Sequence, residues 1–124
     1  MSQSASQAHA LYRQVVITRK VWTIRDQLGF PAPMNGDGSR AQPFWSSLRR
    51  AQKSIATVPA FSQFETVEIA LAAFLDRWLP GLEKDRILVG LNWTGERATG
   101  YDVDTEAVRA ELNVHIGNGD ADRK

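Results

Sequence analysis

The residues of this sequence that are best suited to recognise another molecule gather in two short segments. One is Pro43–Ser46, and the other is Asn92–Tyr101, with the sequence NWTGERATGY. Each segment combines a large aromatic side chain with polar groups and adjoins a predicted strand, and loops carried on a rigid sheet often bind ligands. The candidate binding residues are Trp45, Ser46, Asn92, Trp93, Thr94, Arg97 and Tyr101.

Arg97 and Trp93 supply the recognition chemistry of this candidate site. The guanidinium of Arg97 is a planar fork for a carboxylate or phosphate, and the Trp93 indole offers a large apolar surface at low entropic cost. Trp45 and Trp93 are expected to be partly exposed, whereas Trp22 and Trp78 face the predicted core. The structural alternative is that Arg97 stacks on Trp93 and ties down a hairpin.

The sequence contains little that could support catalysis. Ser46 and Ser47 follow a tryptophan at a predicted helix start, where serine is expected as a cap, and the G-x-S-x-G nucleophile motif is absent. There is no cysteine, and His9 and His115 lie at opposite ends of the chain. Because zinc sites need three or four such ligands, the sequence predicts no metal, and no motif predicts a cofactor.

The charge balance argues against a strongly electrostatic partner. Fifteen basic residues and fourteen acidic residues give a formal net charge of +1. Arg49, Arg50 and Lys53 point outward from a predicted helix and are interpreted as a solvated face, so nucleic-acid binding is disfavoured. The first residues lack the basic and apolar segments of a secretory signal, and no apolar run reaches the length of a membrane span. The expected location is therefore cytoplasmic.

Hydrophobic periodicity predicts a single α+β domain over residues 1–124. Its core is expected over about residues 5–116, with residues 1–4 and 117–124 as flexible tails. The strands are expected to form one mostly antiparallel sheet, with about four helices packed mainly on one face. The predicted helices are 5–18, 46–56, 71–79 and 104–116, and the predicted strands are 21–25, 40–45, 65–69, 87–91 and 97–103.

A predicted helix with a regular apolar face lies at the centre of the chain. Its apolar positions follow helical spacing and are Leu71, Phe74, Leu75, Trp78 and Leu79. Pro80 and Gly81 are expected to end this helix, because proline clashes with the preceding turn. Phe74 and Trp78 are expected to be almost inaccessible to solvent.

The strand Ile87–Leu91 that follows is apolar on both faces, which is typical of a central strand. By strand alternation, Val89, Leu91 and Trp93 should share one face, and Val89 and Leu91 should be almost inaccessible. Gly90 removes a side chain from the other face. This absence indicates the close approach of a helix, another backbone or a ligand.

Several longer stretches of the chain resemble one bacterial family. They are VWTIRD at Val21–Asp26, PFWS at Pro43–Ser46, FLDRWLPGLEKD at Phe74–Asp85 and RATGYDV at Arg97–Val103. In this order they resemble the family known as domain of unknown function 2750, over about Lys20–Val103. The resemblance implies a small, single-domain, cytoplasmic bacterial protein and provides no catalytic residues to carry over. Arg86 and Glu96 depart from the family pattern, which usually has glycine and proline there.

The sequence as a whole favours a non-enzymatic binding or protein-interaction module. Its partner would be another protein or a small polar ligand, and the oligomeric state is left open. One alternative is a small hydrolase or transferase with a site near Trp45, Asn92 and Arg97. Another, by analogy with other compact α+β domains, is an immunity-type protein that neutralises a toxin. A concave pocket holding a titratable pair would favour the enzyme, and an aromatic patch would favour the interaction module.

Overall fold

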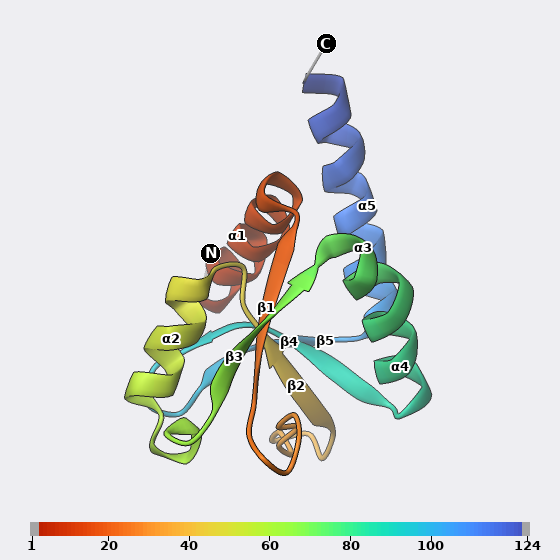
Figure 1. The fold of residues 1–124 in the computed structure, drawn as a ribbon. Helices are drawn as coiled ribbons and strands as arrows, with labels where there is room; N and C mark the ends of the chain where they lie inside the picture. The colour runs from red at the N-terminus through yellow and green to blue at the C-terminus, as the bar shows by residue number, and fades with distance from the viewer. Residues whose placement is uncertain (1–2, 123–124) are drawn as a thin grey trace.

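The computed structural model describes residues 3–122 and confirms the predicted α+β class. Helices and strands follow one another along the chain, and α3, η2 and α4 run on without a break (Figure 1), so that the described residues form four helical segments apart from the short η1. None of these helices is long and apolar enough to cross a membrane. The elements are α1 (Gln3–Thr18), β1 (Lys20–Arg25), β2 (Arg40–Phe44), α2 (Leu48–Thr57), the 3₁₀-helix η1 (Pro59–Phe61), β3 (Glu65–Ala70), α3 (Leu71–Ala73), the π-helix η2 (Phe74–Trp78), α4 (Leu79–Lys84), β4 (Ile87–Thr94), β5 (Thr99–Val103) and α5 (Thr105–Asp122).

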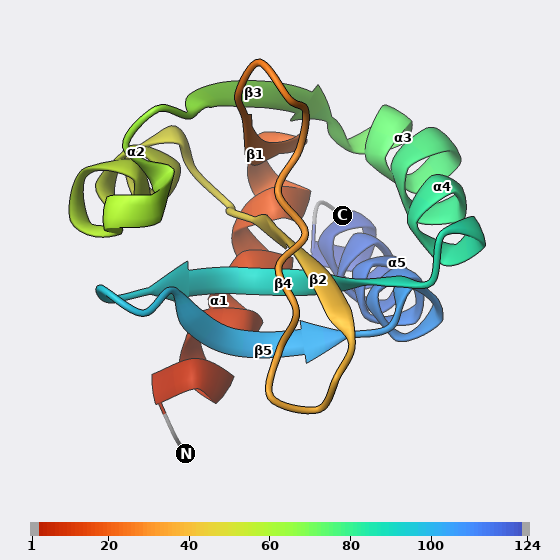
Figure 2. The same cartoon turned by 90° about the horizontal axis from the view of Figure 1, so that it is seen from below.

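The strands are mostly antiparallel, but they divide into two small sheets instead of the one expected. β1 pairs with β3, and β4 lies between β2 and β5 (Figure 2). β1–β3 and β4–β5 are antiparallel, whereas β2–β4 is parallel. A parallel pair needs a long crossover connection, and the chain makes it here through α2, β3 and α4. The sheets meet where Trp22 and Trp45 exchange two backbone hydrogen bonds of 2.8 and 2.7 Å.

Two apolar clusters hold the domain together. The larger one packs α1, α4 and α5 against Val89 and Leu91 of β4. The smaller one packs Ala51 of α2 against Trp45 and Trp93. Residues of α1, α4 and α5 therefore share one cluster with the three-stranded sheet, while α2 packs on a separate cluster.

The expected burial of the central segment is confirmed at three of its four positions. Phe74, Val89 and Leu91 are almost inaccessible, but Trp78 is only partly buried. Its indole lies edge-on to Phe30, with the ring centroids 4.9 Å apart. The helical face predicted from spacing is correct, but Trp78 sits at its margin beneath the loop between β1 and β2.

The predicted helix end at Pro80 is wrong. The chain continues through Pro80 and Gly81 in α4 to Lys84. A π-turn precedes the proline, and the N–H of Leu79 donates to the carbonyl of Phe74 five residues earlier. This wider turn relieves the usual clash between a proline ring and the preceding turn, and Pro80 at the start of α4 needs no N–H donor.

The last helix also extends further than its sequence predicts. α5 runs past Gly117–Gly119 to Asp122, although glycine at this place usually ends a helix. Gly117 does not adopt the left-handed conformation of a terminating glycine, so the helical path continues. α1 begins at Gln3, inside the predicted N-terminal tail. Residues 1–2 and 123–124 of the predicted tails lie outside the described residues.

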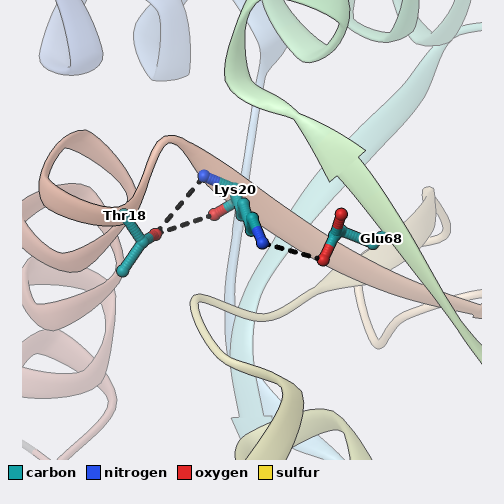
Figure 3. Close-up of polar contacts among 3 residues, drawn as sticks. All are labelled: Thr18, Lys20 and Glu68. Carbon is teal, nitrogen blue, oxygen red and sulfur yellow. Dashed lines mark hydrogen bonds and ion pairs between the residues drawn. The ribbon is translucent and has the colours of Figure 1, made fainter.

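A short polar junction connects α1 to the two-stranded sheet (Figure 3). Arg19 has a φ of 63°, and the hydroxyl of Thr18 accepts a 3.3 Å hydrogen bond from the backbone N–H of Lys20. The Lys20 ammonium then lies 3.2 Å from a carboxylate oxygen of Glu68 on β3. Both side chains are half-exposed, so this pair contributes about 0–1 kcal/mol and helps mainly to align β1 with β3.

Candidate functional site

The predicted site residues divide into a buried group and an exposed group. Trp45 and Asn92 are 0% exposed, Trp93 is 5% exposed and Ser46 is also buried. Thr94 is partly buried, and Arg97 and Tyr101 are exposed. The expectation that Trp45 and Trp93 are partly exposed is therefore wrong. The partly exposed tryptophans are Trp22 and Trp78, which were expected from the sequence to face the core.

A bulge in β4 explains why Trp93 is buried. Asn92 has a φ of 49°, and the β4–β5 register shifts between Leu91 and Thr94. This break in alternation turns Trp93 away from the face of Leu91 and onto the face of Gly90. A Cβ atom on Gly90 would overlap the indole, and one on Gly100 would lie 2.8 Å from it. The close approach at Gly90 is thus made by the side chain of Trp93 and not by a helix, another backbone or a ligand, and the expectation that Trp93 shares a face with Val89 and Leu91 is wrong.

A buried network of amides and hydroxyls anchors this bulge. The side-chain amide of Asn92 donates to the carbonyl of Gln7 at 3.0 Å and to the hydroxyl of Ser46 at 3.1 Å. The Asn92 side-chain oxygen accepts the backbone N–H of Ser46 at 2.9 Å, and the Ser46 hydroxyl donates to Gln14 at 2.5 Å. The side-chain amide of Gln7 donates to Thr94 at 3.2 Å. These bonds join α1, the end of β2 and the start of the β4–β5 hairpin.

The two buried tryptophans attach the same hairpin to α2. The indole N–H of Trp45 donates to the carbonyl of Trp93 at 2.9 Å, and the hydroxyl of Ser54 donates to that carbonyl at 3.2 Å. Trp45, Ser46 and Asn92 therefore support the hairpin from inside. They do not present their side chains to a ligand.

A cleft of about 590 Å³ opens on one side of the hairpin, and we call it the aromatic cleft. Its floor includes Trp93, whose indole N–H donates to one oxygen of Asp102 at 2.9 Å. The amide of Asn35 donates to the other oxygen at 3.0 Å, which ties the loop between β1 and β2 across the sheet (Figure 2). The cleft is lined by Pro33, Met34, Asn35, Gly36, Asp37, Leu88, Trp93, Arg97, Ala98, Thr99, Gly100, Tyr101 and Asp102.

The rim of the aromatic cleft carries three long exposed side chains. Met34 is 57% exposed, Tyr101 is 44% exposed and Arg97 is exposed as well. Arg97 and Tyr101 were predicted as site residues, and the structure brings both to this cleft with Trp93. Met34 was missed because it lies in a proline-rich loop about sixty residues away from the hairpin in sequence.

A second cleft of about 980 Å³ lies on the other side of the hairpin, and we call it the basic cleft. α2 lies on the same side of the molecule as the β4–β5 turn (Figure 2) and provides one wall with Arg49, Arg50 and Lys53. Ser47, Ser54 and Thr57 also line the cleft, together with Gln7 and Gln14 of α1 and residues 94–96 and 99 of the hairpin. From the sequence, the three cations were interpreted as a simple solvated face. In the fold they line a concave surface.

The two histidines are neighbours, although the sequence places them at opposite ends of the chain. The rings of His9 and His115 are 5.7 Å apart, and His115 stacks on Tyr12. Burial raises the pKa of Tyr12 to about 12, with further contributions from the carboxylates of Glu111 and Asp104. Within residues 3–122, no group of three or more histidine or acidic side chains is placed to hold a metal ion.

The fold and its two clefts define a small α+β domain with a rigid, internally bonded hairpin between two concave surfaces. A family model matches residues 8–112, and the chain belongs to that family, described as "Protein of unknown function (DUF2750)". The family resemblance predicted from the sequence is thereby confirmed over a longer segment than expected.

Other comparisons are more distant. No curated protein matches the sequence. Among solved structures, the chain is similar to one titled "Anabaena Tic22 (protein transport)", with 15% sequence identity and a TM-score of 0.40. The match covers 64% of this chain and 44% of that one. A similarity of this size says nothing about what this chain binds.

Proposed function

We propose that this DUF2750 protein is a non-enzymatic protein-interaction module that binds its partner at the aromatic cleft. The observation that carries the proposal is the rim of exposed Met34, Arg97 and Tyr101 around the floor formed by Trp93. Tryptophan, tyrosine, methionine and arginine are the residue types enriched where proteins bind one another.

The rigidity of the floor strengthens this proposal. Trp93 is held between Gly90 and Gly100 and is bonded through its N–H to Asp102, so the indole loses little freedom when a partner binds. The partner segment would place an apolar side chain against Met34 and Tyr101. Its carboxylate would pair with the guanidinium of Arg97, which can form two parallel hydrogen bonds with it.

The enzymatic alternative finds less support in the geometry. Trp45 and Asn92 are buried, whereas Arg97 is exposed at the aromatic cleft, so the three side chains do not converge on a substrate position. The side-chain partners of the Ser46 hydroxyl are the amides of Gln14 and Asn92. An amide cannot take up the proton of an attacking serine, which a nucleophilic mechanism requires.

Partner capture by variants of the tagged protein tests this proposal. Affinity purification from the native host, read by mass spectrometry, should recover a partner with the unaltered protein. Arg97→Ala and Tyr101→Ala should each lose that partner with little change in the melting midpoint. Arg13→Ala removes an exposed arginine of α1 that lines neither cleft, and this variant should still capture the partner. Undiminished capture by both cleft variants would contradict the proposal.

A further inference from the structure

We infer that the basic cleft is a separate binding site for a small phosphorylated ligand. This inference is independent of partner binding at the aromatic cleft, because none of the basic side chains of α2 lines that cleft. It rests on the charge, the donor groups and the size of the basic cleft.

The positive charge of the basic cleft is concentrated and only partly balanced. Arg49, Arg50 and Lys53 lie within about one turn of α2, and Glu96 is the one carboxylate among the lining residues. In the described part of the chain, the two ion pairs are Lys20–Glu68 and Arg25–Glu65, so the three cations of α2 have no acidic partner. A whole chain with a net charge of only +1 thus gathers three cations against one anion here. A ligand with two or more negative charges relieves their mutual repulsion.

The wall facing the cations provides neutral hydrogen-bonding groups. Gln7, Gln14, Thr94 and Thr99 line it with side-chain amides and hydroxyls. The Ser46 hydroxyl donates a hydrogen bond to the side-chain oxygen of Gln14. This bond orients the Gln14 amide so that its nitrogen can donate to another group. The cleft therefore pairs a cationic wall with a polar wall, an arrangement that suits a phosphoryl group attached to a polar organic body.

Size and total charge favour a small molecule over a nucleic-acid strand. The volume of about 980 Å³ is at the upper end of the range for small-molecule pockets. A nucleic-acid site more often extends as a basic stripe across a clearly basic domain, and this chain is nearly neutral. Two of the three cations are arginines, whose planar fork matches the geometry of phosphate oxygens.

Calorimetric titration of inorganic pyrophosphate into the full chain at low ionic strength tests the inference. The unaltered protein should show saturable binding to one site. Arg50→Gln and Lys53→Gln should each weaken it about tenfold, equivalent to about 1.4 kcal/mol. Arg77→Gln is the matched control, because it removes the same charge from an exposed arginine that lines neither cleft, and its pyrophosphate affinity should be unchanged.

Four results would overturn the inference. The first is no saturable binding of pyrophosphate by the unaltered protein. The second is an equal loss of affinity in Arg77→Gln and Arg50→Gln, which would mean a response to net charge alone. The third is tighter binding of citrate, which would identify a carboxylate site. The fourth is tighter binding of a single-stranded oligonucleotide that displaces pyrophosphate. None of these results bears on partner capture at the aromatic cleft.

Discussion

The aromatic cleft and the basic cleft share the β4–β5 hairpin as a wall but are lined by different kinds of side chain. The aromatic cleft rests on a floor that belongs to the core, because Trp93 is buried and its neighbours are bonded to it. The wall of the basic cleft consists of charged side chains on α2, with Arg49 and Lys53 exposed to solvent. The floor of the aromatic cleft is therefore coupled to the stability of the domain, whereas the charged wall of the basic cleft is almost free of it.

This difference shows how a single hairpin can serve two kinds of recognition. The bulge at Asn92 directs Trp93 toward the aromatic cleft, while Thr94 lines the basic cleft. Side chains that point in opposite directions from one strand experience separate environments. Under the two proposals, shape and apolar area would select the ligand on one side, and charge would select it on the other. Changes to the floor should therefore affect folding, whereas changes to the charged wall should affect only binding.

The largest effect is expected from Trp93→Ala. Removing this buried indole leaves a cavity over Gly90 and Gly100, which should lower the free energy of unfolding by about 3–5 kcal/mol. Urea denaturation measures this change. Trp78→Ala is the matched control and should cost less, because Trp78 is partly exposed. If Trp93→Ala proved the milder substitution, the aromatic cleft would not rest on the core.

A smaller effect is expected at Asn92, whose amide joins the hairpin to α1 and β2. Asn92→Ala leaves the buried N–H of Ser46 without its partner and should cost about 1–3 kcal/mol in thermal or urea unfolding. Asn92→Gly loses the same bonds but tolerates the φ of 49°, so it should recover about 1 kcal/mol of this loss. Equal stabilities of the two variants would show that backbone conformation plays no part in holding the bulge.

The smallest effect on stability is expected from Lys53→Gln and Arg49→Gln in the basic cleft. Both side chains are exposed and lack ion-pair partners among residues 3–122, so each substitution should change the free energy of unfolding by less than about 0.5 kcal/mol. Chemical denaturation without added anion measures this. A gain in stability beyond that value would show strong repulsion among the cations, and a comparable loss would mean that the charged wall is part of the scaffold.

Local sequence patterns predicted most of the elements because their causes are local. A serine at position 46 or 47 was predicted to cap α2, and Ser47 does so by accepting the N–H of Arg50. Alternation and apolar runs located β1, β3 and β4 to within a few residues. The helix end at Pro80 was mispredicted because a π-turn, which no residue pattern signals, makes room for the proline.

The candidate site was predicted only in part, for a related reason. Arg97, Tyr101 and Trp93 do line one cleft, but the place of Trp93 in it depends on a bulge at Asn92 that turns its side chain to the other face of the strand. Asparagine adopts a positive φ at little cost in free energy, so no residue pattern in the sequence signals that Asn92 forms a bulge. Whether these residues bind a partner remains a prediction that the capture experiment tests.

The sequence by itself determined the family, the α+β class and the identity of the hairpin as the polar, aromatic part of the chain. The tertiary structure decided which of its residues line a cleft and which face the core. It brought Met34 and Tyr101 to the same cleft, and it gathered Arg49, Arg50 and Lys53 with Gln7 and Gln14 around another. Secondary structure follows from neighbours along the chain, whereas a binding surface joins segments that are distant in sequence, and only packing of the core brings those segments together.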